Sequence, residues 1–96
     1  MSNTAFTQFE ELTVTNAVLS LTASVYGNLN RAILTVADAD IRFTVDGTTP
    51  TTDIGHIAYD SDEVRLQSRD EIVAFRAFRN DSADAELSAS YGVERR

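Results

Sequence analysis

Residues 17–37, AVLSLTASVYGNLNRAILTVA, carry the clearest structural pattern in the chain. Over residues 17–26 apolar side chains alternate with largely wettable ones, and this period of two predicts one long antiparallel strand. Residues 27–30 have turn chemistry, because Gly and Asn tolerate positive φ. Residues 31–37 are apolar on both faces, which predicts a central strand covered on both sides, with a neighbouring subunit as one candidate cover.

Segments with the same pattern continue on both sides of this stretch. Thr, Val, Ile, Tyr and Phe make up 32 of the 96 residues, and these side chains favour strands. Further strands are expected over residues 9–15, 41–46, 56–59, 63–67, 75–79 and 85–91, with a bend at Asn16 and a loop over 47–55. Ser68 and Glu71 have capping-box spacing, so residues 69–73 are expected to form one helical turn. Together these elements predict an all-β fold, a small antiparallel β-sandwich or barrel of seven or eight short strands.

The chain is expected to form a single domain over residues 9–92. Residues 1–8 are polar apart from Phe6 and predict a flexible N-terminal arm. This arm is either a disordered tail or a segment that pairs along a neighbour's sheet edge, with Phe6 in a pocket. Residues 93–96 are expected to form a short charged stub. No signal-peptide pattern opens the sequence, so the chain is expected to be the mature protein.

The composition limits the functions that the chain can have. Eight Arg, no Lys and 15 acidic residues give a net charge of −7, which disfavours binding to nucleic acid phosphates or to an anionic membrane. The chain has no Cys, which excludes disulfides, thiolate nucleophiles and Cys-based zinc sites. It also has no apolar run of about 20 residues, the length of a membrane span. Proteins are therefore the expected partners, and no cofactor or metal is expected.

The sequence offers little catalytic chemistry. His56 is the only His, and no Gly-x-Ser-x-Gly nucleophile elbow accompanies it, so we expect neither enzymatic activity nor a catalytic residue. His56 is expected to end a strand and to bond the loop backbone, and a pH-sensitive contact or an active group is the alternative. The densest carboxylates lie at residues 38–40 and 60–63. They lack the order of an EF-hand, and we expect them to cap turns rather than to bind Ca²⁺.

Arg76 and Arg79 flank Phe78 in the strand expected at residues 75–79. One interpretation is outward-facing charge that shields a sheet edge from other strands. The other is a subunit contact, because Arg and Phe are enriched at protein interfaces. Both interpretations remain open from the sequence.

The stretch IRFTVDGTTPT, residues 41–51, combines with Gly55-His56, Asp70-Glu71-Ile72 and Phe75-Arg76-Ala77 into a longer pattern. This pattern resembles small virion proteins of tailed bacteriophages. A weaker similarity links the Asp-Gly-Thr-x-Pro-Thr motif to the C-terminal immunoglobulin-like module of chitobiase-type enzymes. Those modules normally continue to a Tyr in the next strand, whereas here Tyr59 follows only after a Gly-His insertion. The resemblances cover residues 41–91 and agree on a β-sandwich, and the departure favours the phage family.

The resemblance to phage proteins implies a virion structural protein, most of all a capsid decoration (cement) protein that stabilises the phage head. Its implied partners are the major capsid protein, other virion proteins and its own copies, in a homo-oligomer that is a dimer or a trimer. Its implied location is the capsid surface, after synthesis in the host cytoplasm. The residues expected at these interfaces are Phe6, Phe9, Asp46, Gly47, Thr48, Pro50, His56, Arg76, Phe78 and Arg79.

Two other functions remain open from the sequence. A carbohydrate- or host-surface-binding sandwich would need Tyr26, Tyr59 and Tyr91 to form an exposed aromatic platform. Exposure of two of these side chains on one face would favour that function, and burial would count against it. A head or tail completion protein would use similar protein contacts in few copies, so its copy number in the virion would distinguish it from a decoration protein.

Overall fold

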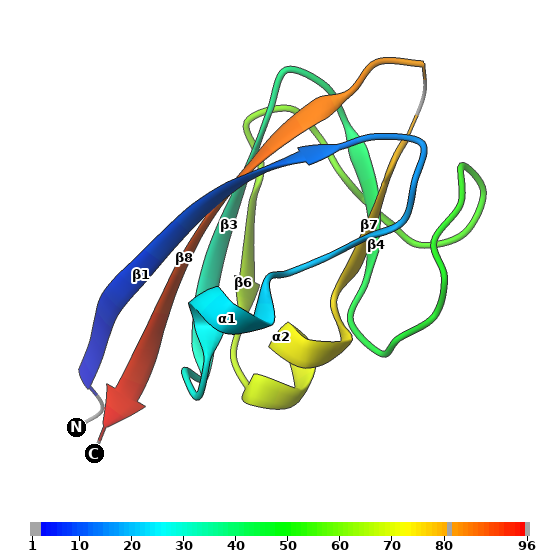
Figure 1. Ribbon diagram of the computed structural model, residues 1–96. Coiled ribbons are helices and arrows are strands. Elements are labelled where there is room, and N and C mark those ends of the chain that lie inside the picture. Colours follow the sequence, from blue (N-terminus) through cyan, green and yellow to red (C-terminus); the bar gives the residue numbers. More distant parts are fainter. Residues whose placement is uncertain (1–2, 81, 96) are drawn as a thin grey trace.

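The computed structural model describes residues 3–80 and 82–95, which form two four-stranded antiparallel sheets packed as a sandwich (Figure 1). Sheet A has the order β1-β8-β3-β6, with β1 at Asn3–Val14, β8 at Ala85–Arg95, β3 at Arg31–Ala37 and β6 at Glu63–Leu66. Sheet B has the order β2-β7-β4-β5, with β2 at Leu19–Ser20, β7 at Arg76–Arg79, β4 at Ile41–Thr44 and β5 at His56–Ala58. Helices α1 (Ala23–Tyr26) and α2 (Arg69–Ala74) lie at one end of the sandwich. The predicted all-β sandwich is confirmed.

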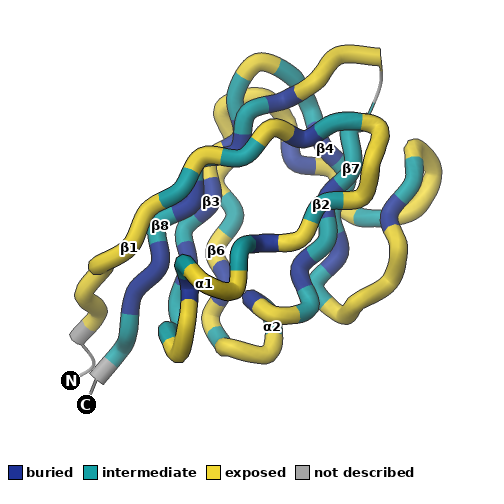
Figure 2. The backbone as a smooth tube through the Cα atoms, in the orientation of Figure 1, coloured by how far each residue is buried: buried dark blue, intermediate teal, exposed yellow. Residues whose placement is uncertain are grey.

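The core lies between the sheets and takes alternate residues from the inner strands. In β8 the fully buried residues are Ala85, Leu87, Ala89 and Tyr91, and in β3 the buried residues are Ala32, Leu34 and Val36. Side chains of the opposite parity point away from the core, so Thr35 is exposed and Ile33 is half-buried. Figure 2 shows the buried segments on β8, β3 and β7, whereas the first part of β1 is exposed.

A bulge in β1 determines which of its residues face outward. The register with β8 runs from Phe6 opposite Gly92 to Phe9 opposite Ser90, with a shift between Phe6 and Gln8. The extra residue restores the alternation, so both Phe side chains lie on the outer face of sheet A. A Cβ atom at Gly92 would overlap the carbonyl oxygen of Ala5, so this close approach of the two strands requires glycine.

The prediction of one long strand over residues 17–26 is wrong. Only Leu19 and Ser20 form a strand there, and residues 23–26 form α1. Leu21 and Tyr26 are buried and Val25 packs against the core, and the adjacent residues 25 and 26 can share one side of a helical turn but not one face of a strand. Tertiary contacts select the helix, because a Glu10 carboxylate oxygen accepts the N–H of Thr22 just before α1 (3.1 Å).

The flexible arm expected over residues 1–8 is wrong for residues 3–8, which pair with β8 of the same chain as part of β1. Residues 93–95, expected in a charged stub, belong to β8. The two polar ends of the chain satisfy each other's backbone groups, and neither end reveals this pairing on its own. Met1, Ser2 and Arg96 lie outside the described residues. The other expected strands and the turn at α2 occur within a few residues of their predicted bounds.

Candidate interaction surfaces

Face A is the outer surface of β1 and β8 that carries Phe6, Phe9, Glu11 and Glu86. Phe6 is 42% exposed and Phe9 is 58% exposed. Large apolar side chains grouped on an exposed face are typical of interaction sites. In sheet A, β1 is also an edge strand, so its outer backbone groups are open to another strand in the part of the chain that the structure describes. Face A therefore offers both aromatic and backbone contacts.

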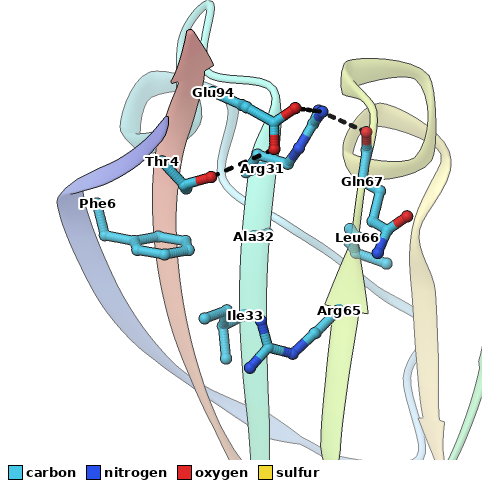
Figure 3. A pocket seen from close by; sticks show the side chains of 9 residues that line it. All are labelled: Thr4, Phe6, Arg31, Ala32, Ile33, Arg65, Leu66, Gln67 and Glu94. Carbon is cyan, nitrogen blue, oxygen red and sulfur yellow. Dashed lines mark hydrogen bonds and ion pairs between the residues drawn. The ribbon is translucent and has the colours of Figure 1, made fainter. Parts of the chain in front are cut away.

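A hollow of about 380 Å³ lies beside Phe6 on the outside of sheet A (Figure 3). The Phe6 ring extends from β1 toward β3 and forms one wall. At one end, Arg31 forms an ion pair with Glu94 (2.9 Å) and donates a hydrogen bond to the Gln67 carbonyl (2.5 Å). Because Glu94 neutralises Arg31, this end of the hollow offers little net positive charge to an anion.

The loop between β4 and β5 packs against its own sheet. Pro50, expected at an interface, is fully buried, so it shapes the loop from within and is not part of the exposed surface. The Thr44 hydroxyl donates a hydrogen bond to the Thr48 carbonyl (2.5 Å), and the Gly47 N–H donates to the Ala74 carbonyl (3.2 Å). Gly47 has a φ of 87°, a conformation that favours glycine. These contacts hold the loop in one shape.

Asp46, Thr48 and His56, all expected at an interface, come together at a second hollow of about 350 Å³. The Thr48 hydroxyl and then its backbone N–H (3.0 Å) hold the pKa of Asp46 below its usual value, and the nearby His56 acts in the same direction. The His56 ring packs against Phe43, with 5.5 Å between the ring centroids. His56 is exposed, and its side chain and that of Asp46 both line this hollow.

Face B is the outer surface of sheet B that carries Arg42, Ile57, Arg76 and Phe78. Arg42 lies opposite Phe78 on β7 and opposite Ile57 on β5. Two of these residues, Arg76 and Phe78, were expected at an interface, and Arg42 was missed. Its place beside Phe78 depends on the strand register, which the local sequence does not reveal.

The two guanidinium groups of face B are held by neutral acceptors. Arg42 donates to the side-chain oxygen of Asn80 (2.9 Å) and to the Gly55 carbonyl (3.0 Å). Arg76 donates to the backbone carbonyls of residues 73 (3.0 Å) and 75 (2.8 Å). Neither forms an ion pair with a described residue, whereas Arg79 pairs with Asp84 (2.8 Å). Face B therefore presents two fixed positive charges that no described carboxylate neutralises.

The three tyrosines do not form an exposed platform. Tyr26 and Tyr91 are buried and contact each other edge to face, with 5.9 Å between the ring centroids. Of the three tyrosines, only Tyr59 is exposed, with an exposed fraction of 56%. This burial counts against the carbohydrate-binding function.

Of the carboxylates at residues 38–40 and 60–63, those of Asp40, Asp60 and Asp62 cap turns, as predicted, whereas Glu63 forms an ion pair with Arg65. Asp60 accepts the N–H of Asp38 (3.2 Å), Asp40 accepts the N–H of Asp60 (2.8 Å), and Asp62 accepts the N–H of Tyr59 (2.8 Å). Within residues 3–80 and 82–95, no group of three or more His, Cys, Asp or Glu residues is placed to hold a metal ion.

Comparison with known protein families, curated proteins and solved structures finds no significant match to this chain. Neither helix among the described residues has the length and apolar character needed to cross a membrane. The function must therefore be inferred from the surfaces of the chain itself.

Proposed function

We propose that this chain is a structural protein of a tailed-phage particle, a capsid decoration (cement) protein that binds capsid subunits and its own copies. The observation that carries this proposal is face A, where an edge strand leaves Phe6 and Phe9 about half exposed. The resemblance of residues 41–91 to phage virion proteins supports the same function.

The energetics of face A suit repeated weak contacts. Full burial of one Phe side chain contributes about 1.5–3 kcal/mol, so covering the exposed parts of two rings contributes about 2 kcal/mol. One such contact is weak, but a shell multiplies it over many copies. The net charge of −7 keeps the free protein soluble until a complementary surface is present.

The proposed function is tested by counting copies of the chain in purified particles of the phage that encodes it. Quantitative mass spectrometry is expected to find the chain in numbers comparable to the capsid subunits. A few copies per particle would instead indicate a head or tail completion protein, and absence from particles would overturn the proposal.

Binding of the purified chain to capsids that lack it gives a second test. Phe9→Asp introduces a charge into the centre of face A and is expected to weaken this binding at least tenfold. Val18→Asp is the matched control, because Val18 is similarly exposed but lies outside both faces. Equal binding by the two variants would exclude face A as the contact surface.

A further inference from the structure

Faces A and B carry opposite charges in matching positions. On face A, Glu11 lies opposite Ser88 and Glu86 lies opposite Thr13, so the two carboxylates are diagonal neighbours across β1 and β8. On face B, Arg42 lies opposite Phe78 and Arg76 lies opposite Thr44, so the two guanidinium groups are diagonal neighbours across β7 and β4. Diagonal positions on antiparallel strands are about 7–8 Å apart, so the backbone positions of the two residue pairs have the same spacing.

These charges are available for a partner. Glu11 is exposed, and Glu86 accepts a hydrogen bond from the neutral Thr13 hydroxyl (3.0 Å). Neither carboxylate forms an ion pair with a described residue, and the same holds for Arg42 and Arg76. The strands of sheet B contain three Arg residues and no Asp or Glu. The strands of sheet B therefore carry Arg without an acidic residue, whereas those of sheet A contain both Glu and Arg.

An apolar group accompanies each charge pair. Phe9 lies on the same side of β1 as Glu11, two residues away, and Phe78 lies directly beside Arg42. Ile57, which is 36% exposed, extends the apolar part of face B on the other side of Arg42. An aromatic centre with flanking charges is typical of protein interfaces, where Phe and Arg are enriched.

The geometry points to a head-to-tail contact between copies of this chain, in which face A of one copy binds face B of the next. The inference rests on the proposed function, because it names the partner that these faces take when the protein assembles. Contact between two copies of face A would bring Glu11 and Glu86 against the same carboxylates, and contact between two copies of face B would oppose Arg to Arg. Both like-charge contacts are unfavourable.

The head-to-tail contact determines the form of the oligomer. Faces A and B lie on opposite sides of the sandwich, so one copy does not use both faces on a single partner. The product is an open chain, because contacts on opposite sides of a body stack its copies in a line, and a ring would need the two contact surfaces to be inclined to each other. This contact is therefore incompatible with the closed dimer expected from the sequence.

Charge-reversal variants test this contact in the full chain. Glu11→Arg alters face A and Arg76→Glu alters face B. Each variant alone is expected to have an association constant at least tenfold weaker than that of the wild type in sedimentation analysis. An equimolar mixture of the two is expected to recover association, because the unaltered face A of Arg76→Glu binds the unaltered face B of Glu11→Arg. The double variant is expected to recover association as well if residue 11 of one copy faces residue 76 of the next, because positive charge then again opposes negative charge. Arg69→Glu, an equal charge change in α2 outside both faces, is the control and is expected to behave like the wild type.

Other outcomes of the same experiment overturn the inference. If Arg76→Glu associates like the wild type, the contact joins two copies of face A. If Glu11→Arg does so, it joins two copies of face B. If the single variants lose association and the mixture does not recover it, the contact is not head-to-tail, because the mixture retains an unaltered face A and an unaltered face B. If the mixture recovers association and the double variant does not, charge pairing between residues 11 and 76 is excluded. Ile57→Asp, at the exposed rim of face B, replaces Arg76→Glu should loss of the Arg76 hydrogen bonds impair folding, as checked by circular dichroism.

Failure of this inference is distinguishable from failure of the proposed function. A wild-type chain that remains monomeric in solution but occurs in many copies in particles overturns the head-to-tail contact and leaves the decoration function in place. A chain that self-associates through both faces but is absent from particles overturns the decoration function and leaves the head-to-tail contact in place.

Discussion

Tyr91 connects three parts of the chain through one hydroxyl group. Its O–H donates a hydrogen bond to a Glu10 carboxylate oxygen (2.6 Å), and the same oxygen accepts the N–H of Thr22 before α1. Burial raises the pKa of Tyr91 far above its usual 10, and the bond to Glu10 raises it further. Strand β8 is thereby joined to β1 and to α1 at one point in the core.

Replacing Tyr91 with Phe tests this network. Above pH 10 the unfolded chain releases the Tyr91 proton while the folded chain retains it, so this residue lowers wild-type stability by about 1.4 kcal/mol per pH unit. We expect Tyr91→Phe to lose this contribution and to have a shallower alkaline decline. At pH 7 the variant is expected to be about 1.5 kcal/mol less stable, because Glu10 loses a hydrogen bond to its charged group. Urea unfolding below and above pH 10 measures both effects, and parallel pH profiles would contradict the network.

Gly92 is required by the close approach of β1 and β8. In Gly92→Ala the new Cβ would overlap the Ala5 carbonyl, so the strands must separate near the bulge. We expect a loss of about 1–3 kcal/mol in unfolding free energy and faster amide exchange over residues 3–9. Ser90→Ala, two residues away on the same face of β8, is the control. Equal stability of the two variants would show that β1 adapts without cost.

The elements differ in how far their own residues determine them. The strand over residues 31–37 was predicted at its observed bounds, because its apolar run is short and is bounded by turn residues on both sides. The segment over 17–26 was not, since its alternating pattern indicates a strand whereas the residues that the core buries, Leu21, Val25 and Tyr26, have helical spacing, and the hydrogen bond from Thr22 to Glu10 comes from a distant strand. The pairing of residues 3–8 with β8 joins opposite ends of the chain, and no local pattern reports it.

The same distinction applies to the surfaces. Asp46, Thr48 and His56 could be grouped from the sequence because one loop brings them together. The positions of Glu11 and Glu86 on face A, and of Arg42 on face B, could not be predicted, because they depend on strand register. The bulge that places Phe6 and Phe9 on one face is likewise visible only in the pairing of β1 with β8.

The loop between β4 and β5 is expected to respond to acid through Asp46. Hydrogen bonds from Thr48 lower the pKa of this carboxyl from 3.8, so the folded loop favours the ionised form. The resulting stability is complete above pH 3.8 and is lost as the pH falls through the lower folded pKa. We expect the wild type to be more stable than Asp46→Asn at pH 7 and this difference to disappear in stronger acid. A difference that stays constant with pH in urea unfolding would exclude the interaction.

Helix α2 depends on its N-cap. The Ser68 hydroxyl accepts the N–H of Glu71 (3.2 Å), and Ile72 in the same turn is fully buried. Ser68→Ala is expected to lower the unfolding free energy by about 1 kcal/mol. Ser24→Ala, at an exposed position in α1, is the comparison in denaturant unfolding and is expected to have little effect. An unfolding free energy that Ser68→Ala leaves unchanged would mean that core packing alone stabilises this turn.

As a unit, the molecule combines a packed sandwich with two outer surfaces of unlike character. Its core is apolar and its turns are capped by their own carboxylates, so the body is rigid without a partner. Face A adds exposed Phe and unpaired Glu side chains, and face B adds Arg side chains held by neutral groups. Under the proposed head-to-tail contact, each copy supplies both halves of the interface.

Sedimentation equilibrium of the wild-type chain, from micromolar to millimolar concentration and at low and high salt, tests self-assembly most directly. We expect the average mass to rise with concentration to at least three times the 10.5 kDa protomer, and the association to weaken at high salt, since paired surface charges are screened. A mass of one protomer at every concentration and salt would contradict assembly through faces A and B.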